Sequence, residues 1–80
     1  MTRQEIIKQT NRFMVEELDI DEELMQPDIE LKRDIGISSI DAVALATFAQ
    51  KTFGCKIIMQ QIKAIITLND LYDYIEHNQE

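Results

Sequence analysis

One stretch near the middle of the chain decides how the rest is arranged, and it reads Asp34-Ile35-Gly36-Ile37-Ser38-Ser39-Ile40-Asp41. Gly36 lacks a Cβ and can adopt the positive φ that a sharp corner between a loop and a helix often needs. Ser38 has the position of a helix N-cap, because Asp41 three residues later completes a pattern like a capping box. This spacing makes Ser39 the first residue of the helix, beside unpaired amide groups and the positive end of the helix dipole.

The hydroxyl of Ser39 is expected to point outward at this corner. A phosphate ester on it would be favoured by the neighbouring N–H groups and the helix dipole, by roughly 0.3–1 kcal/mol for an exposed group. No side chain near Ser39 in the sequence is an obvious general base that would activate this hydroxyl. The pattern therefore gives no sign that Ser39 is a catalytic nucleophile.

Apolar residues spaced three and four positions apart predict helices on both sides of this corner. The expected helices cover residues 2–18, 39–53, 60–64 and the stretch after Thr67. Capping boxes are expected at Thr2 with Glu5 and at Thr67 with Asp70, and Gly54 is expected to end the second helix. The sequence thus predicts an all-α fold, a small four-helix bundle of three main helices and one short one. The side chains expected to face its core include Ile6, Ile7, Phe13, Met14, Leu18, Leu45, Ala49, Thr52, Phe53, Leu68, Leu71, Tyr74 and Ile75.

The long first loop, residues 19–37, is acidic and contains Pro27. Leu24, Ile29 and Leu31 are expected to anchor it on the core, and the alternative is a poorly ordered, solvated linker. Its acidic residues match several ligand positions of an EF-hand, but Leu24 stands where that loop needs glycine, so no EF-hand calcium site is expected. Weak binding of divalent cations by the clustered carboxylates stays open as an alternative.

The isoleucine-rich residues 55–66 are also compatible with a strand, but the sequence offers no second strand to pair with it, so we expect none. Cys55 is the only cysteine, which excludes an internal disulfide and favours a reducing compartment. His77 is the only histidine, so a metal cluster or a Ser-His-acid triad would have to be built around it alone.

Length and charge narrow the class of partner. Eighty residues allow one domain, residues 1–80, with one small core. The formal net charge of −7 argues against nucleic acid and favours partners with basic surfaces. Residues 1–41 hold 11 acidic and 5 basic residues, whereas residues 42–80 hold 4 acidic and 3 basic residues. The first half of the chain therefore supplies most of the negative electrostatic field. No apolar run approaches the roughly 18 residues of a membrane span, and a cytoplasmic location without membrane insertion is expected.

The motif Asp34-Ile35-Gly36-x-x-Ser39-Ile40-Asp41, followed by Val43 and Leu45, resembles the attachment motif of the acyl carrier proteins. In that family the serine of an Asp-Ser-Leu triplet carries 4′-phosphopantetheine, whose thiol holds acyl groups as thioesters. The resemblance covers most of the chain, including the closing Thr67-Leu68-x-x-Leu71-x-x-Tyr74-Ile75. It implies that Ser39 is the attachment site, that the arm comes from coenzyme A, and that the protein is a carrier and not an enzyme.

Two departures from the family pattern bear on the details. Ser38 stands where the family usually has aspartate, and the spacing from Gly36 and Asp41 selects Ser39 from the adjacent pair. The second helix, usually rich in glutamate on its exposed face, has no acid after Asp41 and carries neutral or basic residues such as Gln50 and Lys51. We therefore expect a specialised carrier with partners that differ from those of the housekeeping family member.

An outward apolar strip next to Ser39 indicates a docking surface. The candidate docking residues are Asp34, Ile40, Asp41, Val43 and Thr47. The expected partners are a phosphopantetheinyl transferase and the enzymes that load and accept acyl groups through basic docking patches, all acting on a monomer. The pathway stays open between fatty-acid, polyketide and dedicated acyl-transfer routes.

An alternative from another class is an unmodified, degenerate carrier fold that serves as an acidic protein-interaction module. The missing aspartate before Ser39 and the neutral second helix favour it slightly. A small hydrolase or metal-dependent enzyme is the third interpretation, and the single histidine and single cysteine argue against it.

Overall fold

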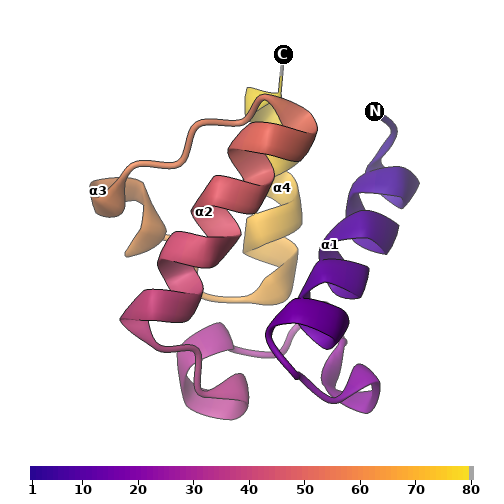
Figure 1. The fold of residues 1–80 in the computed structure, drawn as a ribbon, viewed down its shortest axis with the longest axis vertical. Helices are drawn as coiled ribbons and strands as arrows, with labels where there is room; N and C mark the ends of the chain where they lie inside the picture. The colour runs from indigo at the N-terminus through magenta and orange to yellow at the C-terminus, as the bar shows by residue number, and fades with distance from the viewer. Residues whose placement is uncertain (80) are drawn as a thin grey trace.

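The computed structural model describes residues 1–79, except for the side chain of Met59. Its elements are α1 (Arg3–Glu17), the 3-10 turn η1 (Glu22–Leu24), the π-helical turn η2 (Leu31–Ile35), α2 (Ser39–Phe53), α3 (Met59–Ile62) and α4 (Leu68–Asn78). The three long helices stand side by side, and the short α3 lies outside them next to α2 (Figure 1). The predicted fold class, with three main helices and one short one, is confirmed.

Local capping sets the ends of the helices. The Thr67 hydroxyl accepts a hydrogen bond from the amide of Asp70 at 3.1 Å, and the Asp70 carboxylate accepts one from the Thr67 amide at 3.1 Å, so this capping box is complete. At α1, the Thr2 hydroxyl accepts from the Glu5 amide at 3.3 Å, which is one half of the expected box. Gly54 ends α2 with φ +68°, in the left-handed region that glycine tolerates best.

The core lies between the three long helices and is almost entirely apolar. Its buried hydrophobic side chains are Ile6, Met14, Leu31, Leu45, Ala49, Phe53, Cys55, Leu68, Leu71, Tyr72 and Ile75. Thr52, expected inside, is only half-buried, and Tyr72, which was not expected there, is buried. The Tyr72 hydroxyl donates to the Asn11 side chain of α1, so this tyrosine packs its ring inside and still satisfies its polar group.

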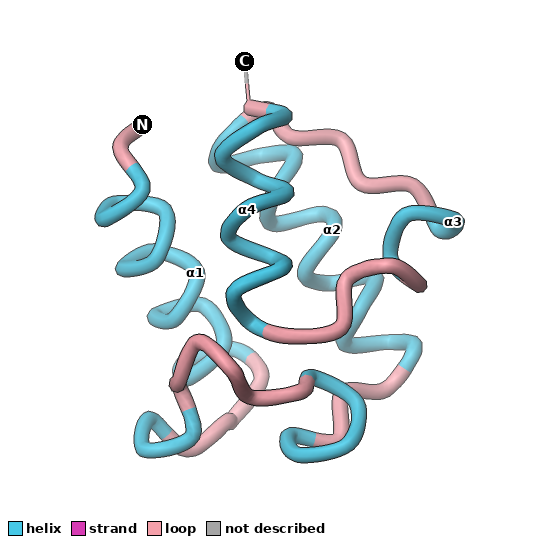
Figure 2. The backbone as a smooth tube through the Cα atoms, turned by 180° about the vertical axis from the view of Figure 1, so that it is seen from behind, coloured by secondary structure: helices cyan, strands magenta, loops and turns pink. Residues whose placement is uncertain are grey.

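The first loop lies beside the start of α4 (Figure 2), and backbone hydrogen bonds join the two. The Leu31 amide donates to the carbonyl of Ile66 at 2.9 Å, and the Leu68 amide donates to the carbonyl of Ile29 at 3.0 Å. Leu31 is buried and Ile29 half-buried, as expected of anchors. This anchoring contradicts the alternative of a poorly ordered linker.

Leu24 was expected to anchor this loop as well, and that expectation is wrong. It belongs to η1, whose three residues include none that is buried, and its side chain is 38% exposed. Other apolar residues of the loop, Ile20, Met25, Ile35 and Ile37, pack against the core instead. Over residues 1–79 the only β pairing is an isolated bridge between Glu30 and Thr67, so the expected absence of a strand in residues 55–66 holds.

Candidate functional site

The corner between η2 and α2 is built on a left-handed glycine. Gly36 has φ +79° and follows the last residue of η2. A Cβ added there would meet no atom within 4 Å, so the backbone conformation and not the available space calls for glycine. The Ile37 amide next to it donates to the Leu31 carbonyl at 3.0 Å, which holds the turn against the core.

The two adjacent serines play different structural roles. The Ser38 hydroxyl accepts a hydrogen bond from the Asp41 amide at 3.2 Å, and the Asp41 carboxylate accepts one from the Ser38 amide at 3.2 Å. Ser39 is the first residue of α2 and is exposed. In the part of the chain that the structure describes, its hydroxyl makes no hydrogen bond. The Ser38 hydroxyl is therefore committed to the helix, whereas the Ser39 hydroxyl is available.

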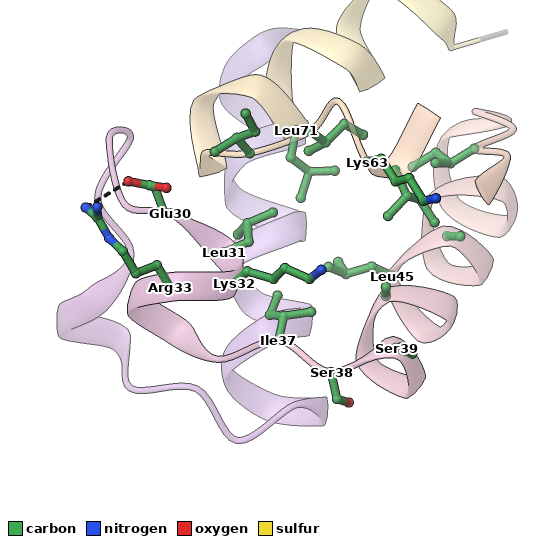
Figure 3. A pocket seen from close by; sticks show the side chains of 16 residues that line it. Glu30, Leu31, Lys32, Arg33, Ile37, Ser38, Ser39, Leu45, Lys63 and Leu71 are labelled. Carbon is green, nitrogen blue, oxygen red and sulfur yellow. Dashed lines mark ion pairs between the residues drawn. The ribbon is translucent and has the colours of Figure 1, made fainter. Parts of the chain in front are cut away.

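A cavity of about 420 Å³ opens beside the two serines, between η2, α2, α3 and the start of α4 (Figure 3). Most of its lining is aliphatic, including Leu31, Leu45, Ile62 and Leu71. Its volume falls in the range of about 300–1,000 Å³ that is typical of small-molecule sites. An apolar group that enters from the side of Ser39 would thus be shielded from water.

Charged residues also line this cavity, and they come from both sides of it. Glu30, Lys32 and Arg33 belong to η2 or flank it, and Lys63 follows α3. Arg33 Nη2 lies 2.8 Å from Glu30 Oε2, the ion pair marked in Figure 3. The Lys32-Arg33 pair stands out in the sequence, but Lys63 lies more than twenty residues after Ser39, and only the tertiary fold brings it to the same cavity.

The candidate docking residues lie on two elements. Ile40 and Val43 are 81% and 52% exposed and share one face of α2 with Thr47, whose hydroxyl donates to the Val43 carbonyl at 3.0 Å. Asp41 lies on the same helix but uses its carboxylate in the capping box. Asp34 lies in η2, where its carboxylate accepts the Glu30 amide at 2.9 Å.

The two other chemically distinctive side chains lie apart from this corner. Cys55 is fully buried, and burial raises the pKa of its thiol, so it behaves as a small core residue. His77 lies near the C-terminal end of α4, at the opposite end of the bundle from the start of α2 (Figure 1). Within residues 1–79, no group of three or more His, Cys, Asp or Glu side chains is arranged to hold a metal ion.

No helix among the described residues combines the length and apolarity that crossing a membrane requires.

Comparison with known proteins identifies the family. A family model described as the phosphopantetheine attachment site matches residues 12–75. The chain is also 34% identical over 65 residues to the acyl carrier protein of Helicobacter pylori (strain ATCC 700392 / 26695), covering 81% of this chain and 83% of that protein. The chain belongs to the acyl carrier protein family.

Two further acyl carrier proteins match over nearly the whole chain. The one from Coprothermobacter proteolyticus is 28% identical over 78 residues, which is 98% of this chain and 95% of that protein. A solved structure of the acyl carrier protein from Enterococcus faecalis superposes with a TM-score of 0.82, covering 99% of this chain and all of that chain at 24% identity. That last match concerns the fold alone, and it agrees with the helical arrangement described above.

Acyl carrier proteins carry acyl groups on 4′-phosphopantetheine, and they are carriers, not enzymes. The predicted family, cofactor and general function are therefore confirmed. As a family member, this protein interacts with a phosphopantetheinyl transferase and with acyl-handling enzymes. The residues present fit the group, because an exposed serine, whose hydroxyl has no partner in the described part of the chain, opens α2 beside an aliphatic cavity.

Proposed function

We propose that Ser39 carries the 4′-phosphopantetheine. The observation that supports this choice over its neighbour is the capping box: the Ser38 hydroxyl accepts the Asp41 amide at 3.2 Å, while the Ser39 hydroxyl has no partner among the described residues. The first turn of α2 also has unpaired amides and the positive end of the helix dipole, which favour a phosphate ester at this position.

The chain itself contributes presentation and shelter. Ser39 holds the arm at an exposed corner that Gly36 and the capping box keep rigid. The arm supplies a thiol for thioester formation when it is attached. The aliphatic lining of the cavity, for example Leu45 and Ile62, would shield an acyl chain from water until a partner enzyme draws it out.

The donor chemistry belongs to a separate transferase. The sole histidine lies at the other end of the bundle, and its Nδ1 is 2.7 Å from the Asp73 carbonyl oxygen. The sole cysteine is buried. Neither side chain is positioned to deprotonate Ser39, which supports attachment of the arm from coenzyme A by a separate protein.

Partner enzymes would dock on the exposed face of α2 formed by Ile40, Val43 and Thr47. These side chains support the proposal because they are exposed without contributing to the core. The internal hydrogen bond of the Thr47 hydroxyl lets this face present mainly apolar atoms. Asp34 and Asp41 flank the face and add negative charge, which favours partners with basic patches.

The lack of acidic residues on α2 after Asp41, together with the Lys32-Arg33 pair before the motif, favours a specialised carrier over the housekeeping member of the family. We propose that it acts as a monomer in the cytoplasm. The exposed part of α2 carries Gln50 and Lys51 in place of acidic residues. A housekeeping ketosynthase or acyl loader should then accept the modified protein poorly. Efficient loading by such an enzyme would contradict this part of the proposal.

Incubation with coenzyme A and a broad-specificity phosphopantetheinyl transferase tests the attachment site. Intact-protein mass spectrometry should show the gain of one phosphopantetheinyl group on the unchanged chain and on Ser38→Ala, and none on Ser39→Ala. Ser38→Ala is the matched control, since it removes an adjacent hydroxyl by the same substitution. A gain that survives in Ser39→Ala, or no gain on the unchanged chain with several transferases, would refute the assignment.

A further inference from the structure

We propose that the cavity beside Ser39 selects acyl groups that end in a carboxylate. This inference rests on the proposed function, because the acyl group would reach the cavity from an arm on Ser39. The lining of the cavity contains one acidic residue, Glu30, and three basic ones, Lys32, Arg33 and Lys63. The whole chain, by contrast, has 15 acidic and 8 basic residues. Basic residues therefore outnumber acidic ones around the cavity in which the acyl group would lie, although acidic residues outnumber basic ones in the whole chain.

Two of the three basic side chains are free to bind a ligand. Arg33 pairs with Glu30 at 2.8 Å and lies 3.6 Å from the Asp34 carboxylate, so its charge is compensated within the protein. Throughout residues 1–79, neither Lys32 nor Lys63 forms an ion pair. Figure 3 shows the Lys32 side chain extended from η2 across the cavity toward α2. Two exposed lysine side chains without an ion-pair partner among the described residues thus line the cavity, one from η2 and one from the end of α3.

The position of Lys63 distinguishes the end of the cargo from the start of the arm. The lining follows α2 from Ser39 to Ala46, which is about 10 Å at 1.5 Å per residue. Lys63 lies on the side of the cavity away from Ser38 (Figure 3). A phosphate bonded to Ser39 remains at the serine end, where the amides of the first turn of α2 are available to it. A cation at the other side is suited to an anion at the far end of the acyl group.

The aliphatic wall and the lysines together describe one kind of cargo. Leu45, Ile62 and Leu71 suit a chain of methylene groups. A methyl terminus gains nothing from an ammonium group and would displace part of its hydration. A carboxylate terminus exchanges that water for a charge-assisted hydrogen bond. The cargo class that fits both parts is a dicarboxylic acid held through one of its carboxyl groups as a thioester.

The test compares two cargoes with the same number of carbons, hexanoyl and adipoyl, each loaded with its arm from the corresponding coenzyme A thioester. Mass spectrometry first confirms loading and then follows cleavage of the thioester by hydroxylamine. In the double variant Lys32→Gln and Lys63→Gln, the adipoyl thioester should be cleaved roughly threefold to tenfold faster than in the unchanged chain, as the loss of two exposed ion pairs implies. The hexanoyl rate should stay unchanged. High salt should reduce the protection of adipoyl in the unchanged chain.

Lys51→Gln is the matched control, because Lys51 is exposed on α2 and does not line the cavity. It makes the same kind of substitution, with half the change of charge of the double variant, and should leave both rates unaltered. Replacement of Lys32 and Lys63 by arginine keeps the charge and should preserve most of the protection. Circular dichroism of each variant checks that the helices are intact.

Four outcomes would overturn the inference. If cleavage of both thioesters were accelerated equally in the double variant, the lysines would stabilise the fold or the arm and would not bind a carboxylate. The ³¹P chemical shift of the arm could differ between the double variant and the unchanged chain when no acyl group is loaded, while the ratio of the two cleavage rates stays constant. That result would mean that the lysines interact with the phosphodiester. Successful loading followed by an unchanged ratio would refute this inference alone. Failure to load the unchanged chain at all would refute the proposed attachment site and this inference with it.

Discussion

The Ser38 hydroxyl accepts a hydrogen bond from the Asp41 amide at 3.2 Å, and the Asp41 carboxylate accepts one from the Ser38 amide at the same distance. This reciprocal pair begins α2, and the adjacent Ser39 hydroxyl has no hydrogen-bond partner in residues 1–79. Ser38 stands where the family usually has aspartate, and it is a suitable N-cap because serine and aspartate are both preferred at this position.

Ser38→Ala should lower the free energy of unfolding by about 1 kcal/mol, because it removes the N-cap acceptor. Ser38→Asp should be as stable as the unchanged chain, since aspartate caps equally well and its charge suits the helix N-terminus. Urea unfolding followed by circular dichroism measures both. A Ser38→Ala protein as stable as the original would show that the cap contributes nothing.

Gly36→Ala should lower the free energy of unfolding by about 1 kcal/mol, because alanine is strained at φ +79°. The added methyl group meets no neighbour within 4 Å, so the loss reflects backbone conformation alone. Gly36→Asn is the discriminating control, since asparagine tolerates this region better and should lose less. Equal losses in thermal or urea unfolding would point to a steric cause and contradict this explanation.

Thr10→Val should stabilise the protein. Thr10 is completely buried, and its hydroxyl has no hydrogen-bond partner within the described residues. Valine keeps the shape and removes the unsatisfied polar atom, so we expect a gain of about 1 kcal/mol and a rise in Tm of about 4–8 °C for a domain of this size. Thr47→Val is the matched control, because that hydroxyl is exposed and bonded to the Val43 carbonyl, and its Tm should barely change. A lower Tm for Thr10→Val would show that the hydroxyl has a partner in solution.

Asp70 should make the stability of the protein depend on pH. Hydrogen bonds from the Thr67 backbone amide, above all, and from the Ile66 amide lower the pKa of its carboxyl, against a smaller opposing effect of burial. Because the folded-state pKa is the lower one, the stabilisation is complete above the unfolded pKa of about 3.9 and is lost as the pH falls through the folded value.

Asp70→Asn should therefore be less stable than the unchanged chain at neutral pH, by about 1 kcal/mol, and the difference should narrow in acid. Urea unfolding at neutral and acidic pH measures this difference. Asp28→Asn, at an exposed loop position, serves as the control and should leave the pH dependence unchanged. A difference that stays constant with pH would mean that ionisation of Asp70 does not stabilise the fold.

Ile40→Ala and Val43→Ala should weaken partner recognition without affecting the fold. Both side chains are mostly exposed, so each substitution should change the free energy of unfolding by less than about 0.5 kcal/mol. The kcat/KM of an acyl-loading enzyme for the double variant should fall on the order of tenfold, as loss of central apolar contacts at an interface implies. Leu24→Ala, an exposed apolar site on η1, should have no effect. Unchanged loading of the double variant would remove this face from the docking surface.

Features that depend on neighbouring residues were predictable from the sequence. The start of α2 at Ser39, the cap at Thr67 and the stop at Gly54 follow from interactions spanning three or four residues. Burial was less predictable, because it depends on packing between elements far apart in the chain. Leu24 is exposed since η1 does not pack on the core, whereas Tyr72 is buried since α1 offers Asn11 to its hydroxyl.

The helical bundle, the corner at residues 34–41 and Ser39 as the exposed first residue of its helix could all be predicted from local sequence patterns, because glycine, capping residues and apolar spacing act locally. The hydrogen bonds between the first loop and the start of α4, and the meeting of Lys63 with Lys32 at one cavity, depend on the packing of distant elements. Those relationships join residues tens of positions apart, and no local pattern encodes them. They depend on how the elements pack together, which is why the cavity and its charge could be read only from the folded chain.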